Sequence, residues 1–341
     1  MAIMLPGPAV QSARLPQAGR RAEWLFSRGK GARVDFALMT EPQLGGTYDE
    51  QLAAARWAER AGLVAFARSD HYYSNREPRP DATDALTVLA GLARETAQIR
   101  LCVLVSPITF RHPAVLAKMA VTIDQMSGGR LDLGVGTGWM DLEHDAFGLP
   151  FPAWNERFGR LEEALLYLQA AFADGPQSFG GRYYELEADV RPKPIAPIPI
   201  IVGGQGPTRT PRLAGAFADE YNHFIADPSD IAPKIARVRQ TARRVGRDPD
   251  RITMSVMGPV LVGIDQNHYR QKLEAAAAAR NEEPEEFERR WASHGIPVGP
   301  PARIAETLAG LEEAGVTKFY VQHLDLADLT GLDQTFEVLR A

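Results

Sequence analysis

The feature that most constrains the fold is a regular alternation of short apolar runs with amphipathic segments, which begins at Val34 and continues to the end of the chain. The apolar runs predict strands at residues 34–39, 63–67, 99–105, 131–135, 198–202, 220–224, 252–262 and 316–321. The segments between and after them predict helices at residues 47–61, 84–96, 113–126, 156–172, 208–218, 231–245, 301–314 and 331–339. Eight strand–helix pairs favour a closed (β/α)8 TIM barrel over an open doubly wound α/β sheet. We therefore expect one barrel domain over residues 34–341.

Local signals support these boundaries and add two insertions to the barrel. Thr47 is a residue type that caps helix N-termini, and Gly62 is typical of a helix stop. Residues 179–186 predict a hairpin around Gly180-Gly181, and residues 269–290 predict one long, charged, alanine-rich helix. The 341-residue chain is long enough for such a barrel with its insertions.

Residues 1–33 differ from the rest, because they carry six arginine and lysine residues against a single acidic residue, Glu23. Pro6 and Pro8 break the apolar stretch at their start, and no hydrophobic segment follows Arg20-Arg21, so the features of a targeting segment are incomplete. We expect a flexible N-terminal extension on a cytoplasmic protein.

Composition excludes several functional classes. The formal net charge of -5 argues against a general nucleic-acid binder, which needs a concentrated basic surface. The apolar runs are far shorter than the roughly 18 residues that a membrane span needs. The one cysteine, Cys102, excludes an internal disulfide and a thiolate-rich metal site, and its position inside a predicted strand indicates a core residue.

In a (β/α)8 barrel the chemistry lies at the C-terminal ends of the strands, and one such end carries the glycine-rich segment Gly203-Gly204-Gln205-Gly206. Its backbone N–H groups, followed by a helix with Pro207 at its first position, are typical of a phosphate site. The same glycines also suit a tight turn with positive φ. A dinucleotide motif is not present, because the glycines after residue 133 are spaced G-x-G-x-G, and no phosphate-binding G-x-x-x-x-G-K-[ST] loop occurs.

Asp70-His71, directly after the second predicted strand, is the best candidate for proton chemistry, because histidine titrates near neutral pH. A structural, hydrogen-bonded histidine is the alternative. Further histidines near strand ends raise the question of a metal hydrolase, but the chain has neither H-x-H on its first strand nor H-E-x-x-H. We expect no catalytic metal.

Taken together, several motifs resemble those of the bacterial luciferase-like family of (β/α)8 oxidoreductases. These are the turns Ser69-Asp70-His71 and Arg111-His112-Pro113, the segment DQMSGGR at 124–130 with LDLGVGTGW after it, Phe147-Gly148, the helix at 156–163 and PIPIIVGGQG at 197–206. Within the family, TEPQ at 40–43, GGTYD at 45–49 and RSDH at 68–71 resemble a branch described as F420-dependent oxidoreductases.

The resemblance implies a flavin-type cofactor across the C-terminal mouth of the barrel. Its ring would lie against a backbone bulge at Leu104-Val105-Ser106, with a non-proline cis peptide, and its phosphate at the 203–206 loop, neutralised by Arg157 or Arg160. The cofactor-binding residues implied in this way are Val105, Ser106, Gly136, Thr137, Gly138, Arg157, Gly203, Gly204, Gln205 and Gly206.

The same resemblance implies catalytic roles for His71, as proton donor or acceptor, and for Asp70, which would orient the cofactor. The chain departs from some deazaflavin dehydrogenases of the family, which have a glutamate at the position of Trp139. Glu143 or Glu41 replaces that carboxylate only if its loop turns inward. We therefore do not expect this chain to catalyse the sugar dehydrogenase reaction of those family members.

We expect the substrate to be a small molecule between aromatic walls, which is typical of an apolar ligand. These walls are Tyr72, Phe110 and Trp139, with the insertion at 268–298 as a lid whose Trp291 and His294 reach over the mouth. Nucleic acid and membrane are not expected partners, whereas a homodimer is expected by analogy with the family.

Three functional hypotheses follow. The first is hydride transfer with coenzyme F420, and the second is a two-component monooxygenase that uses FMN, oxygen and a separate reductase. A non-catalytic flavin-binding protein on the same barrel is the third.

Overall fold

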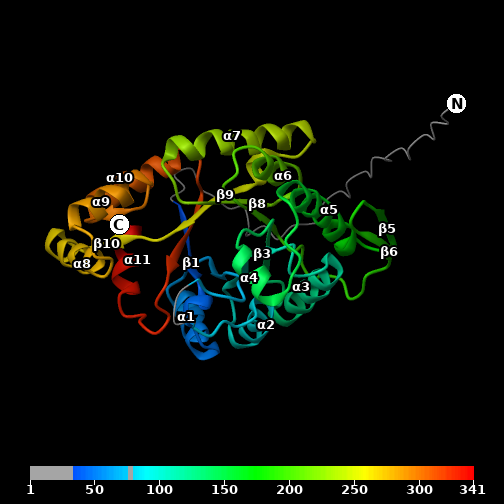
Figure 1. The fold of residues 1–341 in the computed structure, drawn as a ribbon, viewed down its shortest axis with the longest axis horizontal. Helices are drawn as coiled ribbons and strands as arrows, with labels where there is room; N and C mark the ends of the chain where they lie inside the picture. Colours follow the sequence, from blue (N-terminus) through cyan, green and yellow to red (C-terminus); the bar gives the residue numbers. More distant parts are fainter. Residues whose placement is uncertain (1–33, 76–79) are drawn as a thin grey trace. The chain divides into compact units, whose positions relative to one another are not determined.

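A computed structural model describes residues 34–75 and 80–341, so the expected N-terminal extension at 1–33 lies outside the described residues. The described chain forms a closed barrel of parallel strands in the order β1-β12-β9-β8-β7-β4-β3-β2 (Figure 1). This confirms the predicted TIM barrel. Its strands are β1 (Asp35–Thr40), β2 (Ala65–Arg68), β3 (Arg100–Pro107), β4 (Leu131–Gly136), β7 (Ile200–Gly203), β8 (Glu220–Phe224), β9 (Thr253–Gly258) and β12 (Lys318–His323).

The helices that surround the barrel begin and end close to the predicted positions. They are α1 (Tyr48–Arg60), α2 (Ala85–Glu95), α3 (Pro113–Ser127), α5 (Trp154–Phe172), α6 (Arg209–Phe217), α7 (Pro228–Arg244), α10 (Pro301–Glu313) and α11 (Leu332–Arg340). Thr47 caps α1 as predicted, in a reciprocal capping box with Glu50. Gly62 follows α1 with a φ of 70°, a left-handed conformation that glycine adopts without steric cost.

The remaining elements are insertions and short turns. They are η2 (Pro42–Leu44), α4 (Asp141–Phe147), the hairpin of β5 (Gln177–Gly180) and β6 (Glu185–Ala188), η3 (Pro249–Arg251), β10 (Leu261–Val262), α8 (Gln266–Ala278), α9 (Pro284–Ser293) and β11 (Val298–Gly299). The predicted hairpin is confirmed. None of the described helices combines the length and the apolar character that crossing a membrane requires.

Three predicted boundaries are wrong. The helix expected at 269–290 is two helices, because Asn281 adopts a φ of 54° after α8 and Pro284 starts α9. The strand expected at 252–262 stops at Gly258, and Leu261 and Val262 pair instead with β11 in a separate small sheet. Helix α6 starts at Arg209, so Pro207 lies before the helix rather than at its first position.

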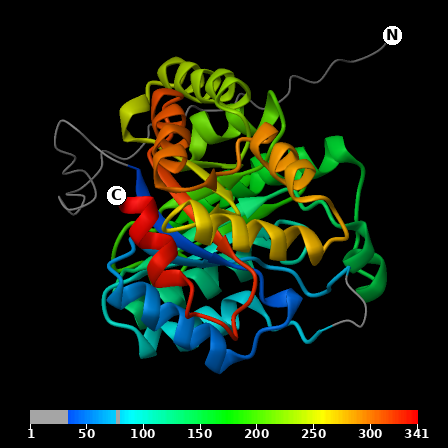
Figure 2. The ribbon, with the colours of Figure 1, turned by 90° about the vertical axis from the view of Figure 1, so that its left-hand side faces the viewer.

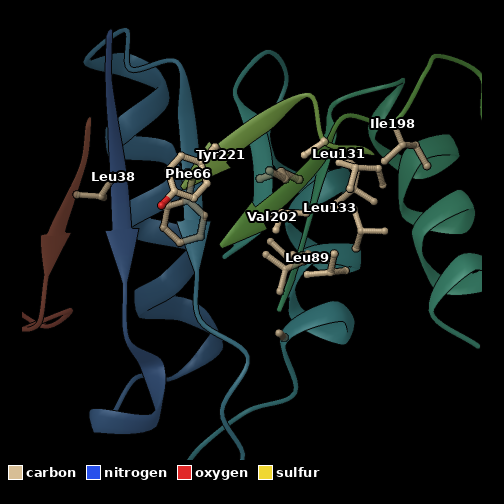
Figure 3. Close-up of a cluster of buried hydrophobic side chains, with 14 of the residues drawn as sticks. Leu38, Phe66, Leu89, Leu131, Leu133, Ile198, Val202 and Tyr221 are labelled. Atoms are coloured by element: carbon tan, nitrogen blue, oxygen red, sulfur yellow. The ribbon is translucent and has the colours of Figure 1, made fainter. Parts of the chain in front are cut away.

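The core has two layers, which follow from the alternation of side chains along each strand. Leu38 of β1 and Phe66 of β2 face outward into the layer between strands and helices, where the aliphatic side chains of Figure 3 gather. Their neighbours Ala37 and Ala67 face the barrel interior. Each large side chain buried in this way stabilises the fold by about 1.5–3 kcal/mol.

The N-terminal end of the barrel interior is ionic. Lys318, at the start of β12, donates to Glu220 of β8 at 2.7 Å, and Arg100 of β3 pairs with Asp132 of β4. Cys102 lies in the same interior, fully buried as predicted, and burial raises the pKa of its thiol well above the usual value. This layer closes one end of the barrel and leaves the opposite end for a site.

Segments far apart in the sequence pack together at the side of the barrel. Helix α11 at the C-terminus lies beside α1, where the Trp57 ring contacts Phe336 at 5.4 Å and the indole nitrogen donates to Asp333 (Figure 2). The insertion helices α8 and α9 share a small apolar cluster of their own around Tyr269 and Phe287.

Candidate active site

Strand β3 ends in a bulge, with a shift of register between Val103 and Ser106 against β4. The peptide bond between Leu104 and Val105 is cis. Both features were predicted for this position, and both are confirmed. They place the backbone of Val105 at the C-terminal mouth of the barrel, where the resemblance to the luciferase-like family predicts the cofactor ring.

Three glycines make room for the Val105 side chain. A Cβ atom added to Gly136 would lie 2.8 Å from one methyl group of Val105, and one added to Gly203 would lie 2.8 Å from the other. Gly134 meets the same side chain at 2.9 Å. Carbon atoms do not approach this closely, so these positions require glycine for packing around the bulge. This explains the first two glycines of the G-x-G-x-G spacing without a dinucleotide, and the third, Gly138, has a positive φ of 76°.

The Gly204–Gly206 turn follows β7 and leads into α6. Gly204 has a φ of 149°, and its N–H donates to the Asn222 carbonyl at 3.1 Å. The turn closes around the buried Thr210, which would lie 3.2 Å from a Cβ atom at Gly204. Because the Gly204 N–H is already used, an anion would have to bind the later N–H groups, among them that of the exposed Gln205.

Positive charge surrounds this turn. Arg209 lies in the first turn of α6, and Arg237 of α7 donates to the Pro207 carbonyl and the Thr208 hydroxyl at 2.9 and 2.8 Å. The first turn of α6 carries no acidic residue. The helix N-terminus and these guanidinium groups favour an anion at this point.

His71 and Glu143 form a buried pair at the end of β2. The Nδ1 atom of His71 lies 2.9 Å from Oε1 of Glu143, and their side chains are 14% and 1% exposed. The second oxygen of Glu143 accepts from the backbone N–H of Tyr72 at 3.1 Å. The loop after β4 therefore turns Glu143 inward, which was the condition set for it to supply the carboxylate missing at Trp139.

Electrostatics favours a protonated His71. Burial by itself would lower its pKa, but the hydrogen bond and charge of Glu143, with the charges of Glu41 and Asp70, outweigh burial and raise the pKa above the usual value. Since Nδ1 is held by Glu143, the other ring nitrogen, Nε2, is the one available to a reacting molecule.

Asp70 is almost fully buried, and both of its carboxylate oxygens accept from Arg111, at 2.5 and 3.3 Å. Arg111 also pairs with Asp84, the N-cap of α2, and donates to Ser106 at 3.2 Å. The role of Asp70 in orienting a cofactor stays a prediction. In the structure its carboxylate fixes Arg111, which connects the loops after β2 and β3.

Arg157 also has a structural partner. It donates to the carbonyls of Gly138 and Pro152, at 2.6 and 3.0 Å, and its guanidinium lies 3.9 Å from the centre of the Phe151 ring. It holds the turn at Gly138, whose φ is 76°. A role of Arg157 in cofactor binding stays a prediction. Thr137, within the same turn, is half-buried.

The residues expected as aromatic walls make two ring contacts, one of them with His71. Tyr72 stacks on Phe110 with ring centres 4.4 Å apart, and Trp139 meets His71 edge to face at 5.6 Å. Trp139 is 66% exposed, a high value for an indole, and leaves an apolar surface beside the imidazole. The expected lid residue Trp291 instead packs on Phe287 at 4.7 Å, inside the insertion.

Sequence reasoning missed a polar network after β1. The Glu41 carboxylate accepts from Gln43 at 2.7 Å and from Gln322 of β12 at 2.8 Å, and Gln43 in turn accepts from Ser69. Their position at the ends of neighbouring strands β1, β12 and β2 was the available signal. The network keeps the charge of Glu41 near His71.

The histidines at the strand ends are dispersed. His112 accepts from the Ala114 N–H as the N-cap of α3, and His223 contacts Lys234 at 2.8 Å. Within residues 34–75 and 80–341, no three His, Cys, Asp or Glu side chains converge in a way that suits a metal ion.

Comparison with known proteins gives one family. The family profile described as luciferase-like monooxygenase matches residues 32–318. An F420-dependent glucose-6-phosphate dehydrogenase from Kineococcus radiotolerans is 37% identical over 166 residues, which are 48% of this chain and 49% of that protein. Pyrimidine monooxygenase RutA from Enterobacter cloacae is 32% identical over 176 residues, 48% of this chain and 47% of that protein. The matches thus span about half the length of these relatives.

Solved structures agree on the fold. An F420-dependent secondary alcohol dehydrogenase in complex with an F420-acetone adduct superposes with a TM-score of 0.74. The superposition covers 91% of this chain and 100% of that one, at 19% sequence identity. Identity this low supports a shared architecture and leaves the chemistry to the residues of the site.

Proposed function

This chain belongs to the luciferase-like monooxygenase family and is an enzyme of that family, and from this premise we propose that it catalyses F420-dependent hydride transfer to or from a small organic substrate. The observation that carries the proposal is the buried His71–Glu143 pair at the mouth of the barrel, an arrangement suited to proton transfer beside a hydride acceptor. The F420-dependent relative supports the cofactor. Family membership argues against the non-catalytic hypothesis.

The described residues fit a cofactor of this kind. The Val105 bulge, wedged among Gly136 and Gly203, presents a surface for a planar ring at the mouth, and the 205–209 segment offers N–H groups and guanidinium charge for a phosphate. We propose that Val105, Ser106, Gly136, Thr137 and Gly138 lie along the ring and its chain. The segment Gly203 to Gly206 would then bind the anionic end.

When bound, a deazaflavin accepts or supplies a hydride, whereas reduced FMN supplies electrons to dioxygen. In its protonated form His71 would give the proton on Nε2 to an oxygen or nitrogen of the substrate when the substrate is reduced. In the opposite direction Nε2 of the neutral ring would take that proton from the substrate. Glu143 keeps the imidazole in place through Nδ1 and stabilises the imidazolium. Trp139 and the stacked Tyr72–Phe110 pair limit the access of water and contact the apolar part of the substrate.

An FMN-dependent monooxygenase is the second candidate, favoured by the similarity to pyrimidine monooxygenase RutA. The bulge and the glycine turn accept either cofactor, because both carry a tricyclic ring and a phosphate. In that case a separate reductase would supply reduced flavin.

Under both hypotheses we propose a homodimer, since Val115 on α3 and Leu166 on α5 are exposed apolar residues. Light scattering of the purified protein tests the dimer.

Fluorescence quenching with each purified cofactor distinguishes the F420 hypothesis from the FMN hypothesis. We expect F420 to bind and FMN to bind at least tenfold more weakly; tight FMN binding without F420 binding would replace the first reading with the second. The variant His71→Ala should keep cofactor affinity and lose about 10²–10⁴-fold in turnover, the usual contribution of a general acid–base group. His268→Ala, in the first turn of α8, is the matched control and should leave both unchanged.

A further inference from the structure

His144 is a fully buried histidine that the proposed reaction does not use. Its Nδ1 lies 2.7 Å from the Met140 carbonyl, and its Nε2 lies 2.7 Å from the Thr109 hydroxyl. A carbonyl only accepts hydrogen bonds, so Nδ1 carries the proton, and in the neutral ring Nε2 accepts from Thr109. The rings of Phe151 and Phe110 lie 4.3 and 5.2 Å from the imidazole. These two hydrogen bonds and two ring contacts fix the position of the His144 side chain.

The helix that carries His144 has few other polar anchors, although the ring of its Phe147 meets Tyr72 and Tyr73 edge to face, with ring centres 5.9 and 6.0 Å apart. Helix α4 has seven residues, and its N-cap, Met140, makes no side-chain capping bond. Its buried residues are Glu143 and His144, while Leu142 and Phe147 are 39% and 55% exposed. A helix this short does not form on its own, so tertiary contacts must hold it.

Thr109, which hydrogen-bonds to His144, is attached to the wall of the barrel. It follows directly after β3 and Ile108, whose N–H donates to the Gly136 carbonyl at 3.0 Å, so its backbone is tied to the barrel wall. The hydrogen bond from Thr109 to His144 therefore connects the rigid end of β3 to α4. Glu143, the neighbour of His144 on that helix, is the residue that meets His71.

We propose that Thr109 and His144 are positioning residues, which hold α4 so that the Glu143 carboxylate reaches Nδ1 of His71. The effect of these residues on catalysis rests on the proposed function, whereas their effect on the position of Glu143 does not. Glu41 and Asp70 also act on His71 by charge, and neither contacts α4 in the hydrogen bonds above, so a loosened α4 removes the Glu143 contribution alone.

The test is the titration of His71 in the full chain, followed by NMR with ¹³C-labelled histidine and assigned with His71→Gln. Thr109→Val removes the hydroxyl at nearly constant volume, and we expect the pKa of His71 to fall toward its usual value of about 6.5. Thr109→Ser keeps a hydroxyl and should restore the wild-type titration. Thr307→Val in α10, which loses a hydroxyl bonded to the Arg303 carbonyl, is the matched control.

A His71 titration in Thr109→Val that matches wild type overturns the inference. If Thr109→Val does not fold, Thr109→Ala removes the same hydroxyl and is judged by the same titration. With active enzyme, Thr109→Val should also lower kcat about tenfold and leave KM for the cofactor unchanged. Failure to turn over any substrate with F420 or FMN would refute the proposed function, and the titration would still decide the positioning role.

Discussion

Replacing Glu143 by glutamine keeps the shape of the side chain and removes its charge, and this change should lower the pKa of His71. The carboxylate lies 2.9 Å from the imidazole, and both side chains are largely buried. Two opposite charges about 4 Å apart near a protein surface interact by about 4 kcal/mol at an effective dielectric constant of 20. Screening by water reduces this interaction, so we expect a loss of at least about 1.4 kcal/mol, or one pKa unit. The charges of Glu41 and Asp70 remain in the variant and keep their own part of the raised pKa.

The assay has two parts, because a raised pKa in the folded state also affects stability. Stabilisation from the protonated His71 is fully present below its unfolded-state pKa of about 6.5, and it is lost as pH rises through the higher folded-state pKa. Urea unfolding should therefore separate Glu143→Gln from wild type more at pH 6 than at pH 9. NMR titration gives the pKa directly. An unchanged pKa together with a pH-independent stability difference would refute the reasoning.

Two further predictions concern the barrel itself. Gly136→Ala places a Cβ atom 2.8 Å from Val105, which is already enclosed by Gly203, so we expect about 1–3 kcal/mol of destabilisation by thermal unfolding and weaker cofactor binding. Gly180→Ala is the control, because no atom of the described residues lies within 4 Å of the added Cβ. Equal effects of the two variants would contradict the packing argument. Lys318→Met leaves Glu220 buried without its cation and should cost about 3–5 kcal/mol in urea unfolding, and the double variant with Glu220→Gln should recover most of that loss.

Much of the architecture was predictable because it depends on local and periodic signals. The alternation of strand and helix patterns predicted the barrel, and Thr47 and Gly62 predicted the limits of α1. The errors lie where one residue interrupts a longer pattern, as Asn281 and Pro284 do between α8 and α9. Such a break is hard to predict within a run of good helix formers, because tertiary packing rather than local helix propensity stabilises the turn.

The C-terminal end of the barrel, with His71 after β2, could be predicted as the place of the candidate site from the sequence alone, because the order of the strands and their ends follow from local sequence patterns. The sequence did not determine which carboxylate His71 meets. Glu143 lies 72 residues away along the chain, and it comes beside His71 through tertiary contacts of α4, among them the hydrogen bond between Thr109 and His144. The partners of Asp70 and Arg157 were likewise decided by tertiary contacts, because a buried charge takes the partner that the fold brings within reach.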